Sequence, residues 1–162
     1  MVAKRIEFIL LLVYLITNLI NLNKIFISSD HAGFKLKQSI IKYLSNNNMN
    51  YQDLGPYTKS RVDYPDYAHK VAKKVKISKN NMGILICGSG TGMNIVANKY
   101  KNIRAAQCFN LKSTKLSRLH NDANIITLGS RLLSTKNALD YVKAFINTKF
   151  EGGRHSKRIK KI

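Results

Sequence analysis

The chain has 162 residues, of which 44% are hydrophobic, so its length and composition fit one globular domain with a buried core. Lysine and arginine outnumber acidic residues by 28 to 8, a formal net charge of +20. This charge favours polyanionic partners, but the lysines are spread along the chain and the basic C-terminal block has no interleaved aromatic residues. Nucleic-acid binding is therefore disfavoured.

The two cysteines, Cys87 and Cys108, cannot form a disulfide framework, which indicates a reducing compartment. The sequence has no CxxC motif and no His/Cys cluster at zinc-ligand spacing. The spacing therefore predicts no zinc site.

Residues 1–23 differ from the rest of the chain. Lys4 and Arg5 precede an unbroken apolar run over 8–16, the profile of a signal peptide or a short membrane anchor. No A-x-A-like cleavage site follows, and the run is short for a bilayer span. The favoured interpretation is an extension ahead of the functional start, with the domain over 24–162 in the cytoplasm. Membrane contact or export is the alternative, and it requires that residues 1–23 are retained or act as a signal.

From Lys24 onward, β-rich apolar runs alternate with helical patterns. In chain order we expect strands over 24–28, 50–54, 82–87, 103–108 and 123–129, with helices over 34–47, 67–77, 93–100 and 111–120 between them and over 135–148 after them. The segment 55–66 is expected to be a loop, and 152–162 a basic helix or tail. The continuous apolar run MGILIC predicts a strand buried on both faces. Alternation of this kind predicts an α/β fold, a five-stranded parallel sheet between helix layers that binds ligands at the carboxyl ends of its strands.

The stretch ILICGSGTG, residues 84–92, ends such a strand on Cys87 and continues into three glycines. It lacks the Gly-Lys-Ser/Thr of a P-loop, and Asn94 replaces the last glycine of a dinucleotide fingerprint. Closely spaced glycines before a helix let backbone amides converge on an anion, either a phosphate or an oxygen that becomes negative during a reaction. A thiolate beside such amides can serve as nucleophile or general base. A cysteine at a strand end is otherwise a packing residue.

Six motifs together resemble one family. They are SSDHAGFKLK, DYPDYA, GILICGSGTGMNIVANK, IRAA, RLHNDANIITLGSR and FEGGRHSKR, in that order between Lys24 and Arg158. This pattern is similar to the type B ribose-5-phosphate isomerases, a family that also includes galactose-6-phosphate isomerase subunits. The resemblance implies a Rossmann-like three-layer sandwich, a homodimer with active sites built from both subunits, and no need for metal or nucleotide.

The resemblance also implies a reaction, the interconversion of D-ribose 5-phosphate and D-ribulose 5-phosphate in the pentose phosphate pathway. Cys87 matches the base that moves a proton between C1 and C2. The loop residues Gly88, Gly90, Thr91 and Gly92 match those that hold the enediolate oxygens. Ser89 stands where many members have threonine, and either hydroxyl can relay a proton. Some relatives use a glutamate after this loop as the base, but Met93 occupies that position here.

Asp30 and His31 match a pair at the end of the first strand, the carboxylate exchanging protons with sugar hydroxyls and the imidazole contacting phosphate. His120 and Asn121 match the family's ring-opening histidine and an asparagine that binds the enediolate. Tyr64 is expected to line the pocket. Without the resemblance, Ser-Asp-His would be a helix cap and His120 a favourable charge at a helix end.

Three arginines match phosphate-binding residues, namely Arg131, Arg154 and Arg158. A guanidinium group forms paired hydrogen bonds with phosphate oxygens. Arg154 and Arg158 are four residues apart and share a face if their segment is helical. Arginines in a basic tail are otherwise simply solvated.

Two alternatives to the pentose enzyme stay open. One is an isomerase of a six-carbon sugar phosphate, allose 6-phosphate or galactose 6-phosphate. The other is a basic, non-catalytic protein that binds nucleic acid or a membrane surface, which the presence of Cys87, His120 and Arg154 argues against.

Overall fold

The computed structural model describes residues 6–7 and 24–162, so the N-terminal segment 1–23 lies outside the described residues except at positions 6–7. Five parallel strands form one sheet in the order β2-β1-β3-β5-β4. Their bounds are β1 Ile25–Ser29, β2 Tyr51–Asp53, β3 Met82–Cys87, β4 Ala105–Gln107 and β5 Ile125–Gly129. The predicted α/β fold with a five-stranded parallel sheet is confirmed.

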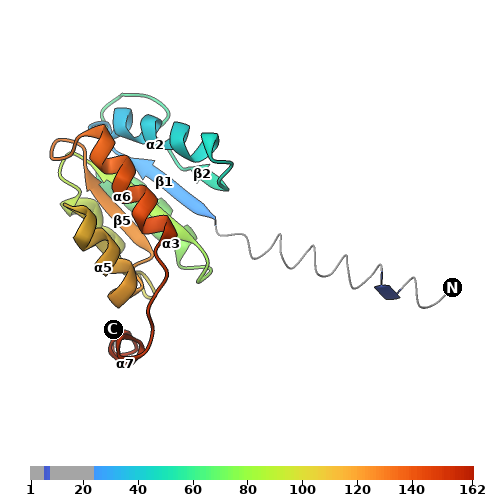
Figure 1. Ribbon diagram of the computed structural model, residues 1–162. Helices are drawn as coiled ribbons and strands as arrows, with labels where there is room; N and C mark the ends of the chain where they lie inside the picture. The colour runs from blue at the N-terminus through green and yellow to red at the C-terminus, as the bar shows by residue number, and fades with distance from the viewer. Residues whose placement is uncertain (1–5, 8–23) are drawn as a thin grey trace.

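Helices connect the strands and cover both faces of the sheet (Figure 1). They are α2 Phe34–Asn46, α3 Tyr64–Val75, α4 Thr91–Ala97, α5 Leu111–Asn121, α6 Thr135–Asn147 and α7 Arg154–Ile159. Within the described ranges, no helix has the length and apolar character needed to cross a membrane.

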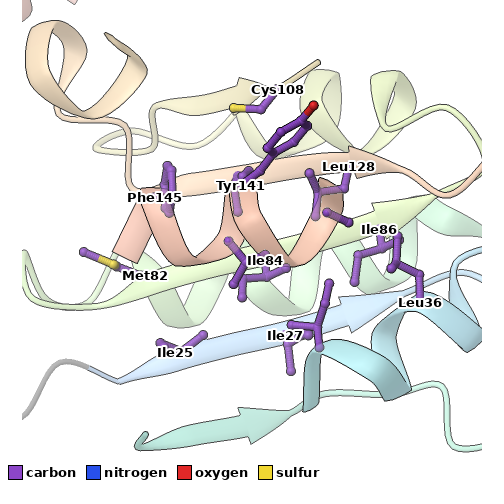
Figure 2. Packing of buried hydrophobic residues seen from close by; sticks show 14 of the residues in the cluster. Ile25, Ile27, Leu36, Met82, Ile84, Ile86, Cys108, Leu128, Tyr141 and Phe145 are labelled. Carbon is purple, nitrogen blue, oxygen red and sulfur yellow. The ribbon is translucent and has the colours of Figure 1, made fainter. Parts of the chain in front are cut away.

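Two apolar layers hold the helices to the sheet, because successive side chains of a strand point to opposite faces. Ile27 and Ile84 face the layer that α2 and α6 close with Leu36 and Phe145, as Figure 2 shows. The opposite layer contains apolar residues of α3 and α4 packed on the other sheet face, and Cys87 belongs to it. Helices, sheet and helices therefore form the three layers of the sandwich, with one apolar core on each face of the sheet.

Two predicted helix starts were late. α3 begins at Tyr64, inside the segment expected to be a loop, because Pro65 is tolerated in the first turn of a helix, where its missing N–H costs nothing. α4 begins at Thr91 and not at Met93, since Gly90 adopts a left-handed conformation with φ of 85° and turns the chain directly into the helix. Residues 152–162 were expected to be a basic helix or a tail, and they contain the helix α7.

The strand order places the candidate site. The chain leaves β1 in one direction toward β2 and later places β3 on the other side of β1, so the crossover connections diverge between β1 and β3. Ligands bind outside the carboxyl ends of strands at such a switch point. Ser29 pairs with Ile86 across these strands, which brings the residues after them, Asp30 and Cys87, to the same edge.

Candidate active site

Cys87 is the last residue of β3 and is 5% exposed. Its Sγ accepts a hydrogen bond of 3.0 Å from the N–H of Gly90. The side chain thus combines packing in the apolar layer beneath α4 with one polar contact from the glycine loop. The sulfur therefore has a backbone donor held at hydrogen-bond distance.

The glycine loop, residues 88–92, uses part of its donors internally. The N–H of Gly90 points at Cys87, and that of Thr91 lies 3.3 Å from the Ser89 hydroxyl oxygen. In the described part of the chain the N–H groups of Gly88, Ser89 and Gly92 donate to no acceptor. The expectation was that all five amides from Gly88 to Gly92 bind one anion. One of them instead donates to the sulfur and one to the Ser89 hydroxyl, which leaves three amides available to a ligand.

Two residues that the sequence did not single out hold this loop. Gln107, at the carboxyl end of β4, donates through Nε2 to the carbonyl oxygen of Ser89 at 2.7 Å and to the Thr91 hydroxyl at 3.0 Å. Gly129 ends β5, where a Cβ atom would lie 2.6 Å from the same Ser89 oxygen. The loop is seated against two strand ends, so its amides keep a fixed direction.

Asp30 and His31 follow β1 at the edge of the sheet where β3 ends on Cys87. The N–H of Asp30 donates to the carbonyl oxygen of Ile86 at 3.0 Å, and its buried carboxylate accepts from Gly33 at 2.8 Å. Gly33 and not Asp30 is the N-cap residue of α2, so Asp30 is not the helix cap that its residue type suggests. His31 is half-buried, with Nδ1 3.2 Å from the carbonyl oxygen of Val62.

Arg131 and Tyr64 border the glycine loop from opposite sides. A Cβ atom at Gly88 would lie 3.2 Å from the guanidinium carbon of Arg131, and one at Gly92 would lie 2.6 Å from the ring of Tyr64. The N–H of Arg131 donates to the carbonyl oxygen of Gly88 at 3.1 Å. One cation and one aromatic ring therefore flank the amides that are free to bind a ligand.

The other expected site residues lie on the opposite side of the domain, near the amino-terminal edge of the sheet. His120 and Asn121 end α5, where the carbonyl oxygen of Asn121 accepts from Arg104, the residue that precedes β4. Arg154 and Arg158 are on α7, which Figure 1 shows at the bottom of the molecule while the tip of β1 points to the upper left. An 11-residue helix such as α5 is about 16 Å long. One chain therefore does not bring Cys87 and His120 together.

His120 has neighbours that sequence analysis missed. Its ring stacks on that of His155, with centroids 4.2 Å apart and planes 4° from parallel. Glu151 Oε2 lies 3.7 Å from His120 Nε2 and 3.9 Å from His155 Nε2. The pKa of His155 is lowered from its ordinary value, first by burial of the ring and then by the nearby charges of His120 and Arg154. Spacing in the chain could not reveal a cluster that joins residue 120 to residues 151 and 155.

A cavity of about 560 Å³ lies near this second end, between α7 and the segment after α3. Its charged lining residues are Lys76, Lys79, Arg104, Asp122 and Lys160. None of the residues around Cys87 lines it, so its size says nothing about the space at the carboxyl edge of the sheet.

Comparison with known proteins agrees with this arrangement. Residues 25–162 match the sequence profile of the Ribose/Galactose Isomerase family. Ribose-5-phosphate isomerase B of Escherichia coli is 41% identical over 141 residues, which cover 87% of this chain and 95% of that protein.

Solved structures match as well. Ribose-5-phosphate isomerase B of Clostridium thermocellum superposes with a TM-score of 0.83 at 45% identity, covering 85% of this chain and 93% of that one. The Mycoplasma genitalium enzyme with bound ribulose-5-phosphate gives a TM-score of 0.83 at 43% identity, covering 85% and 92%. The chain belongs to the Ribose/Galactose Isomerase family.

Proposed function

We propose that this protein is an aldose-ketose isomerase that interconverts D-ribose 5-phosphate and D-ribulose 5-phosphate in the pentose phosphate pathway. Family membership and the named activity of relatives above 40% identity support it. The observation that carries the chemistry is the Cys87 thiol at the end of β3, with the Gly90 N–H directed at its sulfur. A thiol with a backbone donor at its sulfur is suited to act as a base or a nucleophile.

Cys87 acts as the general base. The thiolate removes the proton from C2 of the open-chain aldose, which leaves an enediolate whose charge rests on the oxygens of C1 and C2. Return of the proton to C1 gives the ketose, so the reaction neither gains nor loses atoms or electrons. The Gly90 N–H stabilises the thiolate before the proton moves and releases it as the thiol forms.

The enediolate needs donors that are already in place when its charge develops. The N–H groups of Gly88, Ser89 and Gly92 supply them, while Gly90 and Thr91 shape the turn into α4. The exposed hydroxyl of Ser89 relays a proton between the two oxygens. Asp30, whose backbone is tied to the residue before Cys87, exchanges protons with the sugar hydroxyls.

The phosphate is held by cations and an imidazole. His31 and Arg131 lie at the same edge as Cys87, and Tyr64 closes the side of the pocket against Gly92. Arg154 and Arg158 supply two further guanidinium groups, one turn apart on α7. A phosphorylated substrate is favoured over a neutral sugar by this positive charge.

His120 opens the cyclic sugar by moving a proton between the ring oxygen and the anomeric hydroxyl, and Asn121 binds the enediolate. Both lie on the side of the domain opposite the carboxyl edge of the sheet, where Cys87 is. We therefore propose a homodimer in which each active site combines the Cys87 edge of one subunit with α5 and α7 of its partner. Exposed apolar residues beside the carboxyl ends of β4 and β5 support such an interface. They are Phe109, Leu111 and Leu132.

The experiment is conversion of ribose 5-phosphate to ribulose 5-phosphate by the purified protein with a metal chelator present, since we propose that no cofactor is needed. We expect turnover, and a higher kcat/KM for the pentose phosphate than for allose 6-phosphate or galactose 6-phosphate. A higher kcat/KM for a hexose phosphate would show that the natural substrate is a six-carbon sugar phosphate. If the protein binds an oligonucleotide in a salt-sensitive way and has no isomerase activity, it is a nucleic-acid-binding protein and not an enzyme.

We also propose a cytoplasmic location. The described cysteines, Cys87 and Cys108, are both unpaired, which supports a reducing compartment. The role of residues 1–23 decides this proposal, and a cell fractionation with the full-length chain tests it.

A further inference from the structure

Three side chains at the junction of α5 and α7 offer ligand atoms to a common point. His120 ends α5, Glu151 follows the loop after α6, and His155 lies in α7. One ligand atom of each lies within 4.8 Å of the others, and the Nε2 atoms of His120 and His155 are 3.7 and 3.9 Å from Glu151 Oε2. Two neutral imidazoles and a carboxylate are a set of ligands typical of divalent transition metals.

The distances suit an ion after a small movement. Bonds of about 2.0–2.1 Å to a tetrahedral zinc ion separate its ligand atoms by roughly 3.4 Å. His120 and Glu151 have exposed side chains, 37% and 57%, so their rotamers can adjust to bring the ligand atoms closer. Because the rings are parallel, the His120 ring must also tilt so that both lone pairs meet at one point.

His155 is the fixed ligand of the three. Its side chain is only 6% exposed and is held in α7 by the helix backbone. Arg154 Nε donates to His155 Nε2 at 3.4 Å, a long bond that an ion would displace.

The surrounding charge limits the affinity. Arg154 and Arg158 lie on the same helix and repel a cation, whereas Glu151 is the one carboxylate in the cluster. Metals that form strong bonds to imidazole tolerate this field better than Mg²⁺ or Ca²⁺, whose binding depends on several carboxylates. The geometry therefore favours zinc over the hard cations.

We propose that His120, Glu151 and His155 form a binding site for a divalent transition-metal ion of the zinc type, and that occupation of this site inhibits the enzyme. A metal bound to Nε2 of His120 blocks the nitrogen that moves the proton in ring opening. The binding itself is independent of the proposed function, and only the inhibition rests on it. The ion is thus an inhibitor and not a cofactor.

Calorimetric titration of the full chain with Zn²⁺, in a buffer free of phosphate and chelators, tests the site. We expect one ion per chain from this cluster, and at least about tenfold weaker binding in Glu151→Gln and in His155→Gln. Glu151 is exposed, so its near-isosteric replacement preserves the fold even if the change at buried His155 does not. Asp140→Asn and His69→Gln are matched controls on α6 and α3, and their affinity should equal that of the unchanged protein.

The Cys87→Ala background separates this site from the thiol. Zinc binding that persists in Cys87→Ala and weakens on addition of Glu151→Gln supports the proposal. Binding lost in Cys87→Ala, or unchanged by Glu151→Gln and His155→Gln, overturns it. Zinc binding by a protein that lacks isomerase activity would leave the site standing while refuting the proposed function. An active enzyme that binds zinc here without inhibition would refute the inhibition alone.

Discussion

The sulfur of Cys87 and the backbone nitrogen of Gly90 are 3.0 Å apart in the turn that joins β3 to α4. This contact explains why a buried strand ends on cysteine and continues into glycines. The φ of Gly90 is 85°, a left-handed conformation that glycine adopts without strain and that turns the chain from this contact into α4. The loop sequence and the chemistry of the thiol are therefore parts of one feature.

Gly90→Ala should damage activity more than stability. A Cβ atom there would be 3.0 Å from the carbonyl carbon of Leu128, and left-handed backbone costs an alanine about 1–2 kcal/mol. Alanine keeps the N–H, but relief of this strain moves the amide away from the sulfur, so we expect kcat/KM to fall about a hundredfold, the scale of losing one oriented donor at a reacting charge. Urea unfolding and the isomerase assay, both below the unfolding transition, measure the two effects. Activity close to that of the unchanged protein would show that the Gly90 amide does not assist Cys87.

His120→Ala tests the ring-opening role. Loss of this base should slow a substrate that is mainly cyclic and spare a four-carbon aldose phosphate, which cannot close a furanose ring. The measurement is the ratio of kcat/KM for ribose 5-phosphate to that for erythrose 4-phosphate, in this variant and in His69→Ala as the matched control. An equal loss of kcat/KM for both substrates would show that His120 does not act in ring opening.

Mixing two inactive variants tests whether sites are shared between chains. Cys87→Ala and His120→Ala each remove a group from a different part of the proposed site. If the parts come from different subunits, a mixed dimer has one intact site and one with both changes. Unfolding and refolding the two variants together should then restore about one quarter of the original activity. No recovery, with mixed dimers demonstrated by mass spectrometry, would mean that each site is built within one chain.

The stability of the α7 region should fall as the solution is acidified. His155 has a lowered pKa in the folded state, so below its ordinary pKa of about 6.5 the unfolded chain binds the proton more readily. The contribution is therefore present above that pH and is lost as the pH falls toward the folded-state value. Urea unfolding at about pH 7.5 and 5.5 should show a larger loss of stability in the unchanged protein than in His155→Gln. An equal loss in both would show that another group titrates.

The fold could be predicted because each element has a strong local pattern. MGILIC is apolar throughout since β3 is central in the sheet, and the helices over 34–46 and 135–147 show one apolar face each. The start of α3 was missed because Pro65 suggests a loop although a first turn accepts it. Local patterns predict periodicity well and boundaries less well.

The candidate site could be predicted only in part. The groups near Cys87 follow strand ends, so a parallel sheet brings them to one edge. Gln107 was missed because its contact with Ser89 joins segments 18 residues apart, and a glutamine at a strand end has no distinctive pattern. His155 and Glu151 were missed because only the docking of α7 beside α5 places them at His120. Contacts between distant segments depend on the folded arrangement.

The most direct measurement follows the hydrogen on C2 of the substrate. With ribose 5-phosphate deuterated at C2, the unchanged protein should form ribulose 5-phosphate and move the label to C1 or release it to solvent. Cys87→Ala should do neither while still binding the sugar phosphate, and Cys108→Ala, which alters a thiol buried beneath α6, should behave like the unchanged protein. Label transfer by Cys87→Ala at the original rate would contradict the assignment of this thiol as the base.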